Sequence, residues 1–283
     1  MSLAVITGLA AEARIAVAPS GAMLVGAGRS DRLAADLETA IARGARRLLS
    51  FGVAGALAPH LQAGDLIVAH GVLDGARRHS CDVAWREAMS GRLRRASERH
   101  PHPHAPHSVR DRSAGSGLFR FAGAAGWQPI SHSAGRPSPA ADIAAVDAPL
   151  ADAVGKTALF AATGAAAVDM ESAIVARAAL RHDLPFAILR VIADPAHRPL
   201  PSAALVAMGA DGEVDIGAVL GALLRNPRQL PALIRLARDS RDAFAALGRA
   251  RAVLGEDFGS LGLAQAAPDA DVAQDWSAVT VAG

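Results

Sequence analysis

The chain alternates between short apolar runs and segments whose apolar residues recur every three or four positions. Glycine or acidic residues bound the short runs, which is the pattern of buried strands. The runs cover residues 3–7, 22–25, 47–51, 65–69, 142–146, 165–169 and 186–193. Because strands that alternate with helices pack as layers, we predict an α/β fold with a central mixed, twisted sheet flanked by helices.

Five segments have the periodicity of helices. The first begins after Ser30 or Asp31, either of which can cap it, and ends at Gly44. Asp147 and Pro149 suit the start of the second. The five helices are predicted over residues 32–43, 148–162, 171–182, 215–224 and 231–247. The last two form a C-terminal helical extension over about 215–250.

Residues from about 100 to 140 break this pattern. They hold six of the 16 prolines and five of the ten histidines, and they lack apolar periodicity. We interpret them as an insertion that forms a long loop or is disordered. The alternating His and Pro residues also suit a metal-binding hypothesis, but proline spacing imposes no ligand geometry, so no metal site is predicted. The remainder is a single domain over residues 1–255 with a flexible tail, 256–283.

Composition narrows the class of protein. The formal net charge is +2, and Lys156 is the only lysine among 29 basic residues. No basic stretch is interleaved with aromatic residues, so we predict no nucleic-acid partner. Cys81 is the only cysteine, which excludes an intramolecular disulfide. No apolar stretch approaches the ~18 residues of a membrane span and the N-terminus lacks a basic leader, so we expect a cytoplasmic protein.

Carboxylates follow two of the predicted strands. Asp169 and Glu171 come at the end of the run 165–168, and Asp194 closes the run 186–193. Ligands of open α/β sheets bind outside the carboxyl ends of the strands, so we expect these acids to share one hollow. Local structural roles are the alternative: Asp169 suits a helix cap, Glu171 a first helical turn, and Asp194 a turn before proline.

Glycines follow a third predicted strand. Gly52 and Gly55 let backbone N–H groups approach a ligand closely. The pair lacks the third glycine and the acidic residue of a dinucleotide-binding fingerprint, so no nucleotide cofactor is predicted.

Three motifs together resemble the nucleoside phosphorylase superfamily, in the branch of the methylthioadenosine/S-adenosylhomocysteine nucleosidases. They are the segment 51–59 with 64–68, the segment Val-Asp-Met-Glu-Ser at 168–172, and the segment Arg-Val-Ile-Ala-Asp at 190–194. A closer resemblance is to the hopanoid-associated phosphorylases, through segments 8–14, 156–164, 194–201 and 226–233. The resemblance implies the nucleoside phosphorylase fold and cleavage of a purine N-glycosidic bond.

The resemblance also implies roles for individual residues. Asp194 matches the residue that protonates purine N7, and Glu171 matches the residue that holds the ribose hydroxyls. Glu12 falls at the place of a glutamate that positions water, whereas Gly8, Arg14 and the turn predicted at 52–55 are the candidates for holding phosphate as a co-substrate. Val53 and Ala193 stand where related nucleosidases carry serine. The implied substrate-binding residues are Glu171, Met170, Asp169, Val168, Gly55 and Ala54.

The implied reaction is release of adenine from adenosylhopane, by phosphate or by water. The alternatives are a nucleosidase or phosphorylase for smaller adenosine thioethers, and a nucleoside-binding protein without catalysis. The resemblance further implies a homodimer or larger homo-oligomer. The C-terminal helices are interpreted as a wall of the pocket or a peripheral membrane contact, with an ordinary packed helix pair or dimer contact as the alternative.

Overall fold

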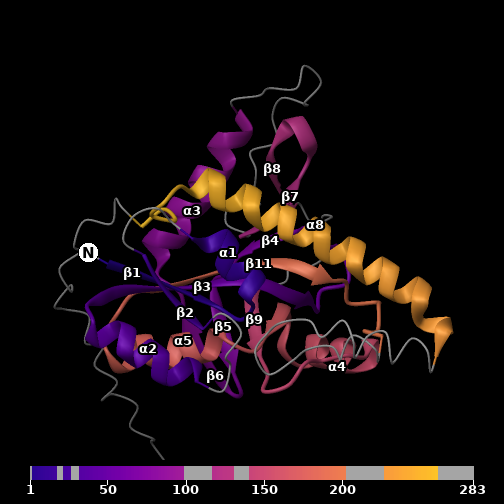
Figure 1. The fold of residues 1–283 in the computed structure, drawn as a ribbon, viewed down its shortest axis with the longest axis horizontal. Helices are drawn as coiled ribbons and strands as arrows, with labels where there is room; N and C mark the ends of the chain where they lie inside the picture. Colours follow the sequence, from indigo (N-terminus) through magenta and orange to yellow (C-terminus); the bar gives the residue numbers. More distant parts are fainter. Residues whose placement is uncertain are drawn as a thin grey trace, which may run out of the picture.

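The computed structural model describes residues 2–17, 22–26, 32–98, 117–130, 140–201 and 226–260. In these residues a single mixed sheet of 11 strands lies between two layers of helices (Figure 1), as predicted. The strands are β1 (Ser2–Thr7), β2 (Met23–Gly26), β3 (Ala45–Ala56), β4 (Leu66–Val68), β5 (Gly71–Asp74), β6 (Arg77–Ser80), β7 (Leu118–Phe121), β8 (Trp127–Pro129), β9 (Ala140–Ala145), β10 (Ala165–Asp169) and β11 (Phe186–Asp194). Their order is β6-β5-β9-β10-β3-β11-β4-β7-β8, and β1 pairs with β2 and β3.

The helices bury separate apolar surfaces on the two faces of the sheet. The described helices are α1 (Ala10–Ala16), α2 (Leu33–Ala42), α3 (Val83–Glu98), α4 (Ala153–Thr163), α5 (Ser172–Arg181) and α8 (Leu230–Leu254). On one face α3 and α8 pack against Phe51 and Val191. On the other face α2 and α5 pack against Leu48 and Ile188. Neighbouring residues of β3 and β11 point to opposite faces, so these two strands supply both cores.

β3 is the longest strand and the axis of the sheet. It pairs in parallel with β11 along almost its whole length, from Leu48 beside Phe186 to Gly55 beside Asp194. β10 pairs with it antiparallel, with Val168 beside Gly55. The two strands overlap only at their carboxyl ends, so the carboxyl ends of β10, β3 and β11 meet at Gly55, although β10 runs opposite to the other two. Beyond Asp169 the chain continues antiparallel to β3 and leads to Glu171.

One predicted turn and one predicted helix start differ in the structure. Gly52 and Gly55 lie within β3 rather than in a turn after it, because hydrogen bonds to β11 and β10 keep the glycines extended. α4 begins at Ala153, not near residue 148, because the Asp152 carboxylate accepts the backbone N–H of Gly155 at 2.6 Å. The caps predicted for α2, Ser30 and Asp31, lie outside the described residues.

The interpretation of residues 100–140 as a loop is wrong for residues 117–130. β7 and β8 form a hairpin there that joins the sheet at β4. Phe119 and Trp127 are buried, and the Trp127 ring packs edge-on against Phe121 with 5.4 Å between ring centroids. The hairpin forms because this part of the segment is rich in apolar side chains, which include Leu118, Phe119, Phe121 and Trp127. The histidine-rich stretch 100–107 lies outside the described residues.

The C-terminal extension is anchored on the sheet. α8 crosses the molecule (Figure 1) and buries a stripe at helical spacing, which consists of Ala243, Ala246, Leu247, Ala250 and Leu254. Phe258 is also buried, against Phe51, so the predicted flexible tail does not begin at residue 256. The predicted helix 215–224 lies outside the described residues. Within the described residues, no helix has the length and hydrophobicity to cross a membrane.

Candidate active site

A buried arginine gathers three carboxylates beside β3. Arg190 lies on β11 and is fully buried. Its Nε lies 2.6 Å from Asp169 Oδ2, and its Nη2 lies 3.1 Å from Glu171 Oε2. Nη2 also donates to Ser50 Oγ at 2.8 Å. Burial lowers the pKa of Arg190, but the charges of Asp169, Glu171 and Glu12 outweigh burial and raise it, so the guanidinium stays charged.

Glu12 reaches this cluster from α1. Its Oε2 accepts the backbone N–H groups of Gly8 at 2.8 Å and Leu9 at 2.9 Å, and its Oε1 accepts that of Val53 at 2.7 Å. Burial raises the pKa of the Glu12 carboxyl, although Arg190 and the three backbone donors oppose the rise. The carboxyl is thus fixed in place and keeps affinity for a proton, as a general base requires.

Glu171 is the third carboxylate of the cluster and the N-cap residue of α5. Burial raises its pKa to about 7, with Arg190 opposing the rise and the charges of Asp169 and Glu12 adding to it. Asp169 itself accepts the Ser172 hydroxyl and the Ser172 backbone N–H, the latter at 3.2 Å. Asp169 therefore connects Arg190 to the start of α5. By accepting the Ser172 N–H it also satisfies one free donor of the first helical turn, although Glu171 rather than Asp169 is the N-cap residue.

Glycines make room for each acid. A Cβ atom on Gly8 would lie 2.4 Å from Glu171 Oε1. A Cβ atom on Gly52 would lie 2.4 Å from Glu12 Oε1 and 2.6 Å from Arg190 Nη1. The sequence predicts that a ligand lies close to these glycines. In the structure the space left by their missing side chains is occupied by Glu171, Glu12 and Arg190 instead.

Asp194 lies at the end of β11 and is paired with a buried lysine. Lys156 Nζ, from α4, contacts Asp194 Oδ2, and the Lys156 side chain is fully buried. Burial raises the pKa of the Asp194 carboxyl, Lys156 lowers it, and the charge of Asp239 adds to the rise. A Cβ atom on Gly55 would lie 3.0 Å from Asp194 Oδ1 and 3.3 Å from Val168. Asp194, Val168 and Gly55 are therefore neighbours.

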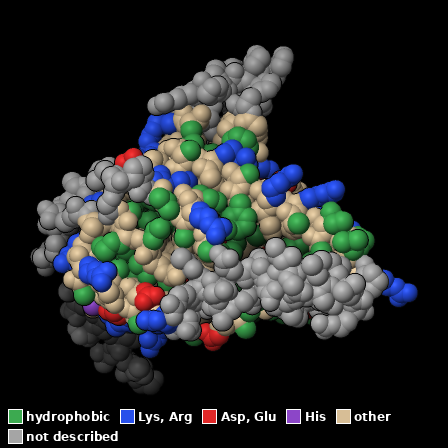
Figure 2. All heavy atoms as spheres, in the orientation of Figure 1, with side chains coloured by type: hydrophobic (Ala, Val, Ile, Leu, Met, Phe, Trp, Pro, Cys, Tyr) green, Lys and Arg blue, Asp and Glu red, His purple; other side chains and the backbone are tan. Residues whose placement is uncertain are grey.

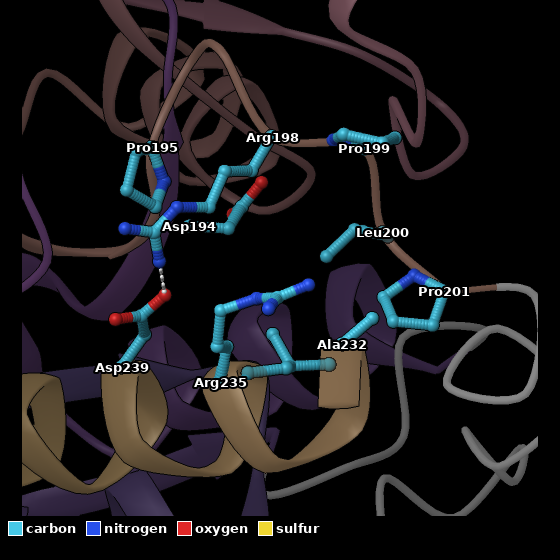
Figure 3. A pocket seen from close by; sticks show the side chains of 10 residues that line it. Asp194, Pro195, Arg198, Pro199, Leu200, Pro201, Ala232, Arg235 and Asp239 are labelled. Carbon is cyan, nitrogen blue, oxygen red and sulfur yellow. Dashed lines mark hydrogen bonds and ion pairs between the residues drawn. The ribbon is translucent and has the colours of Figure 1, made fainter. Parts of the chain in front are cut away.

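A cavity of about 210 Å³ opens beside Asp194 (Figure 3). One wall is the segment that follows β11, and the other is the first half of α8. Arg198 and Asp239 form an ion pair across it. The lining residues are Asp194, Pro195, Arg198, Pro199, Leu200, Pro201, Ala232, Arg235, Leu236 and Asp239. The first half of α8 thus forms one wall of this cavity.

The two groups of acids lie along the same strand. Gly52 faces Glu12 and Arg190, and Gly55 faces Asp194, three residues further along β3. Three residues of a strand span ~10 Å, and positions an odd number apart point to opposite faces of the sheet, so the two glycines alone do not place both groups of acids in one hollow. Among the described residues the cavity is lined by Asp194 but not by Glu171. Of the other predicted ligand residues, Met170 is half-buried after β10, and Ala54 is buried in the core.

The residues predicted to bind phosphate do not form an anion site. The N–H groups of Gly8 and Val53 are both used by Glu12. Arg14 is exposed on α1, two residues from Glu12, and side chains two positions apart do not share a helix face. The cluster instead has three carboxylates for one guanidinium, which opposes binding of a dianion.

Two important residues have no role in the sequence interpretation. Arg190 falls inside a run that looks apolar, and a charged residue in the middle of such a run is the signal that identifies it. Lys156 is the sole lysine and begins the segment 156–164 that carries part of the resemblance, but neither observation assigned it a role. The described residues contain no group of three or more His, Cys, Asp or Glu side chains arranged to hold a metal ion.

The sequence model of the phosphorylase superfamily matches residues 1–225. The chain belongs to this superfamily. The prediction of a nucleoside phosphorylase-like enzyme that acts on N-glycosyl bonds is therefore confirmed at the level of the superfamily. No curated protein matches the chain significantly.

Solved structures of two nucleosidases share the fold of this superfamily member. The S-adenosylhomocysteine nucleosidase of Streptococcus pyogenes is 16% identical, with a TM-score of 0.52, and the match covers 92% of this chain and 97% of that one. The 5′-methylthioadenosine/S-adenosylhomocysteine nucleosidase of Neisseria meningitidis is 17% identical, also with a TM-score of 0.52, over 92% and 99%. At these identities the likeness confirms the fold.

Proposed function

We propose that this protein hydrolyses the N-glycosidic bond of an adenine nucleoside. One observation carries the proposal: burial raises the pKa values of three acids, each of which lies against a glycine that leaves space for it. Glu12 lies against Gly52, Glu171 against Gly8 and Asp194 against Gly55. Burial that raises the pKa of a carboxyl brings it closer to the range in which carboxyls serve as general acids and bases. The superfamily assignment makes the N-glycosyl bond the target of this chemistry.

In the proposed reaction Asp194 donates its proton to purine N7. The bond between the anomeric carbon and N9 then breaks, and its electron pair remains on the departing adenine. Glu171 accepts hydrogen bonds from the ribose hydroxyls, and the carboxylates of the Arg190 cluster favour the positive charge that develops on the ribose. Glu12 orients a water molecule toward the anomeric carbon and accepts its proton.

The choice of water over phosphate rests on the charge of the Arg190 cluster. Three carboxylates surround the single guanidinium, and backbone N–H groups that suit an anion already donate to Glu12. Such a site attracts a neutral nucleophile more readily than a phosphate dianion. Phosphate as a co-substrate, the other possibility considered from the sequence, has no comparable support among the described residues.

We propose adenosylhopane as the substrate, with release of adenine for hopanoid side-chain synthesis. The support is the resemblance of segments 8–14 and 226–233 to hopanoid-associated phosphorylases, together with the apolar side chains of the cavity beside Asp194. The second candidate is a smaller adenosine thioether: the two solved nucleosidases were crystallised with 5-methylthiotubericidin and methylthio-immucillin-A. A peripheral membrane contact and a homo-oligomer stay predictions from the sequence, as does a cytoplasmic location.

Free adenine, measured by chromatography, tests the proposal. Purified protein is incubated with adenosylhopane, methylthioadenosine or S-adenosylhomocysteine, each with and without phosphate. We expect adenine from adenosylhopane at a rate that does not depend on phosphate. Faster release from the thioethers would overturn the substrate assignment, and an absolute phosphate requirement would overturn hydrolysis. Binding of all three without adenine release would identify a non-catalytic nucleoside-binding protein.

A further inference from the structure

Lys156 ties α4 to the segment that carries Asp194. Its Nζ contacts Asp194 Oδ2 and lies 3.2 Å from the carbonyl oxygen of Arg198 and 3.5 Å from that of Pro195. An ammonium group has three protons to donate, and here all three partners come from residues 194–198. Its side chain has no exposed surface, so these partners replace all of its hydration.

The residue type at this position is unusual for the chain. Every other basic residue is arginine, whose planar guanidinium stays charged and demands a forked arrangement of acceptors. Lysine presents a compact charge with rotatable donors, which fits one carboxylate oxygen and two carbonyls at a strand end. A buried ion pair adds little net stability, so stability alone does not account for it.

We propose that Lys156 is a positioning residue for Asp194: its ammonium holds Oδ2, leaves Oδ1 toward Gly55 and the substrate, and stabilises the carboxylate that remains after proton transfer. The proposal rests on the proposed function, in which Asp194 protonates purine N7. When the proton leaves Asp194, the electron pair of the broken glycosidic bond stays on the base, and a carboxylate is left beside Lys156. Asp194 regains its proton from solvent after adenine departs.

The other charges around Asp194 do not replace Lys156. Asp239 faces it from α8 and has the same sign, while Arg198, from the segment after β11, is paired with Asp239. Arg235 lines the same cavity from α8 (Figure 3) without a contact to Asp194. Burial raises the pKa of Asp194 and Lys156 opposes the rise. Removing Lys156 therefore leaves a weaker acid that keeps its proton to higher pH.

Lys156→Met tests the inference through the pH profile of kcat/KM for adenine release. Activity requires protonated Asp194, so it falls as pH rises through the pKa of that carboxyl. We expect this basic limb to move to higher pH by about one to three units, the usual effect of losing an opposite charge at contact distance. Lys156→Arg, which keeps the charge, should return the limb toward the wild-type position. A basic limb at the wild-type pH in Lys156→Met would overturn the proposal.

A double variant keeps the test decisive if Lys156→Met does not fold. Lys156→Met/Asp194→Asn removes both buried charges together, which is tolerated better than removing one. Because Lys156 acts through Asp194, the double variant should be as active as Asp194→Asn alone. A further tenfold loss in the double variant would overturn the role of Lys156. Wild-type turnover by Asp194→Asn would instead overturn the proposed function and not the ion-pair geometry.

Discussion

Asp194→Asn is expected to lower the rate of adenine release by about 10²–10⁴-fold, the usual contribution of a general acid. The amide has nearly the shape of the carboxyl group but holds no proton that it can transfer to purine N7. The change leaves β11 and its pairing with β3 in place, because those contacts are made by the backbone. Initial rates of adenine release, with circular dichroism to verify the fold, measure the effect.

Asp142→Asn is the matched control. Asp142 is also a largely buried aspartate in an ion pair, with Arg78, whose Nε lies 2.8 Å from Asp142 Oδ2. It lies on β9, toward the β5–β6 edge of the sheet, and not at the cavity beside Asp194. The control should lose stability but keep its rate. Equal rates in the two variants would remove Asp194 from the chemistry.

Arg190→Met is expected to destabilise the protein by about 3–5 kcal/mol, the range for breaking a buried ion pair by removing one partner. Three buried carboxylates, those of Glu12, Asp169 and Glu171, would lose the charge that compensates them. The pKa of Glu171 is already raised to about 7, so its carboxyl is protonated at low pH and the repulsion is then weaker. The loss of stability should therefore be larger at pH 8 than at pH 5.

Urea unfolding at the two pH values measures this loss. Arg177→Met is the control, because Arg177 pairs with Asp74 at 2.8 Å but its side chain is 47% exposed. An exposed pair contributes at most about 1 kcal/mol, so the control should unfold near the wild-type midpoint. If Arg190→Met were as stable as this control at pH 8, the carboxylates would not depend on Arg190 for their charge balance.

The order of strands and helices could be predicted because apolar runs are a local property. The strands 165–169 and 186–193 match β10 and β11 to within one residue. Pairing is not local, and no pattern in β10 indicates that it runs antiparallel to β3. The hairpin of β7 and β8 was missed because its apolar residues form two very short runs separated by glycines, inside a segment rich in proline and histidine; in the structure they pack against α3 and β4.

The candidate site could be predicted only where a residue stands out at a strand end. Glu171 and Asp194 do so, and the motif around them led to the resemblance. Arg190 was missed because the acids that balance its charge are distant in the sequence. The nearest of them, Glu171, is 19 residues away, and Glu12 lies on α1. The role of Gly52 could also be recognised only in the structure, because Gly52 lies against Arg190 and Glu12 rather than a ligand.

Figure 2 shows hydrophobic and basic side chains side by side over the strip where α8 crosses the molecule. Two residues of α8, Arg235 and Leu236, line the cavity beside Asp194. The C-terminal extension is therefore part of the site's architecture as well as of the core, because its second half supplies Leu247 and Leu254 to the buried apolar layer.

The most direct test is a crystal structure with a C-nucleoside analogue of adenosine, whose carbon–carbon glycosidic bond the enzyme cannot cleave. One bound analogue should place its base within hydrogen-bond distance of Asp194 and its ribose hydroxyls within hydrogen-bond distance of Glu171. An analogue that touched only one of these carboxyls, or that bound away from both, would contradict the account.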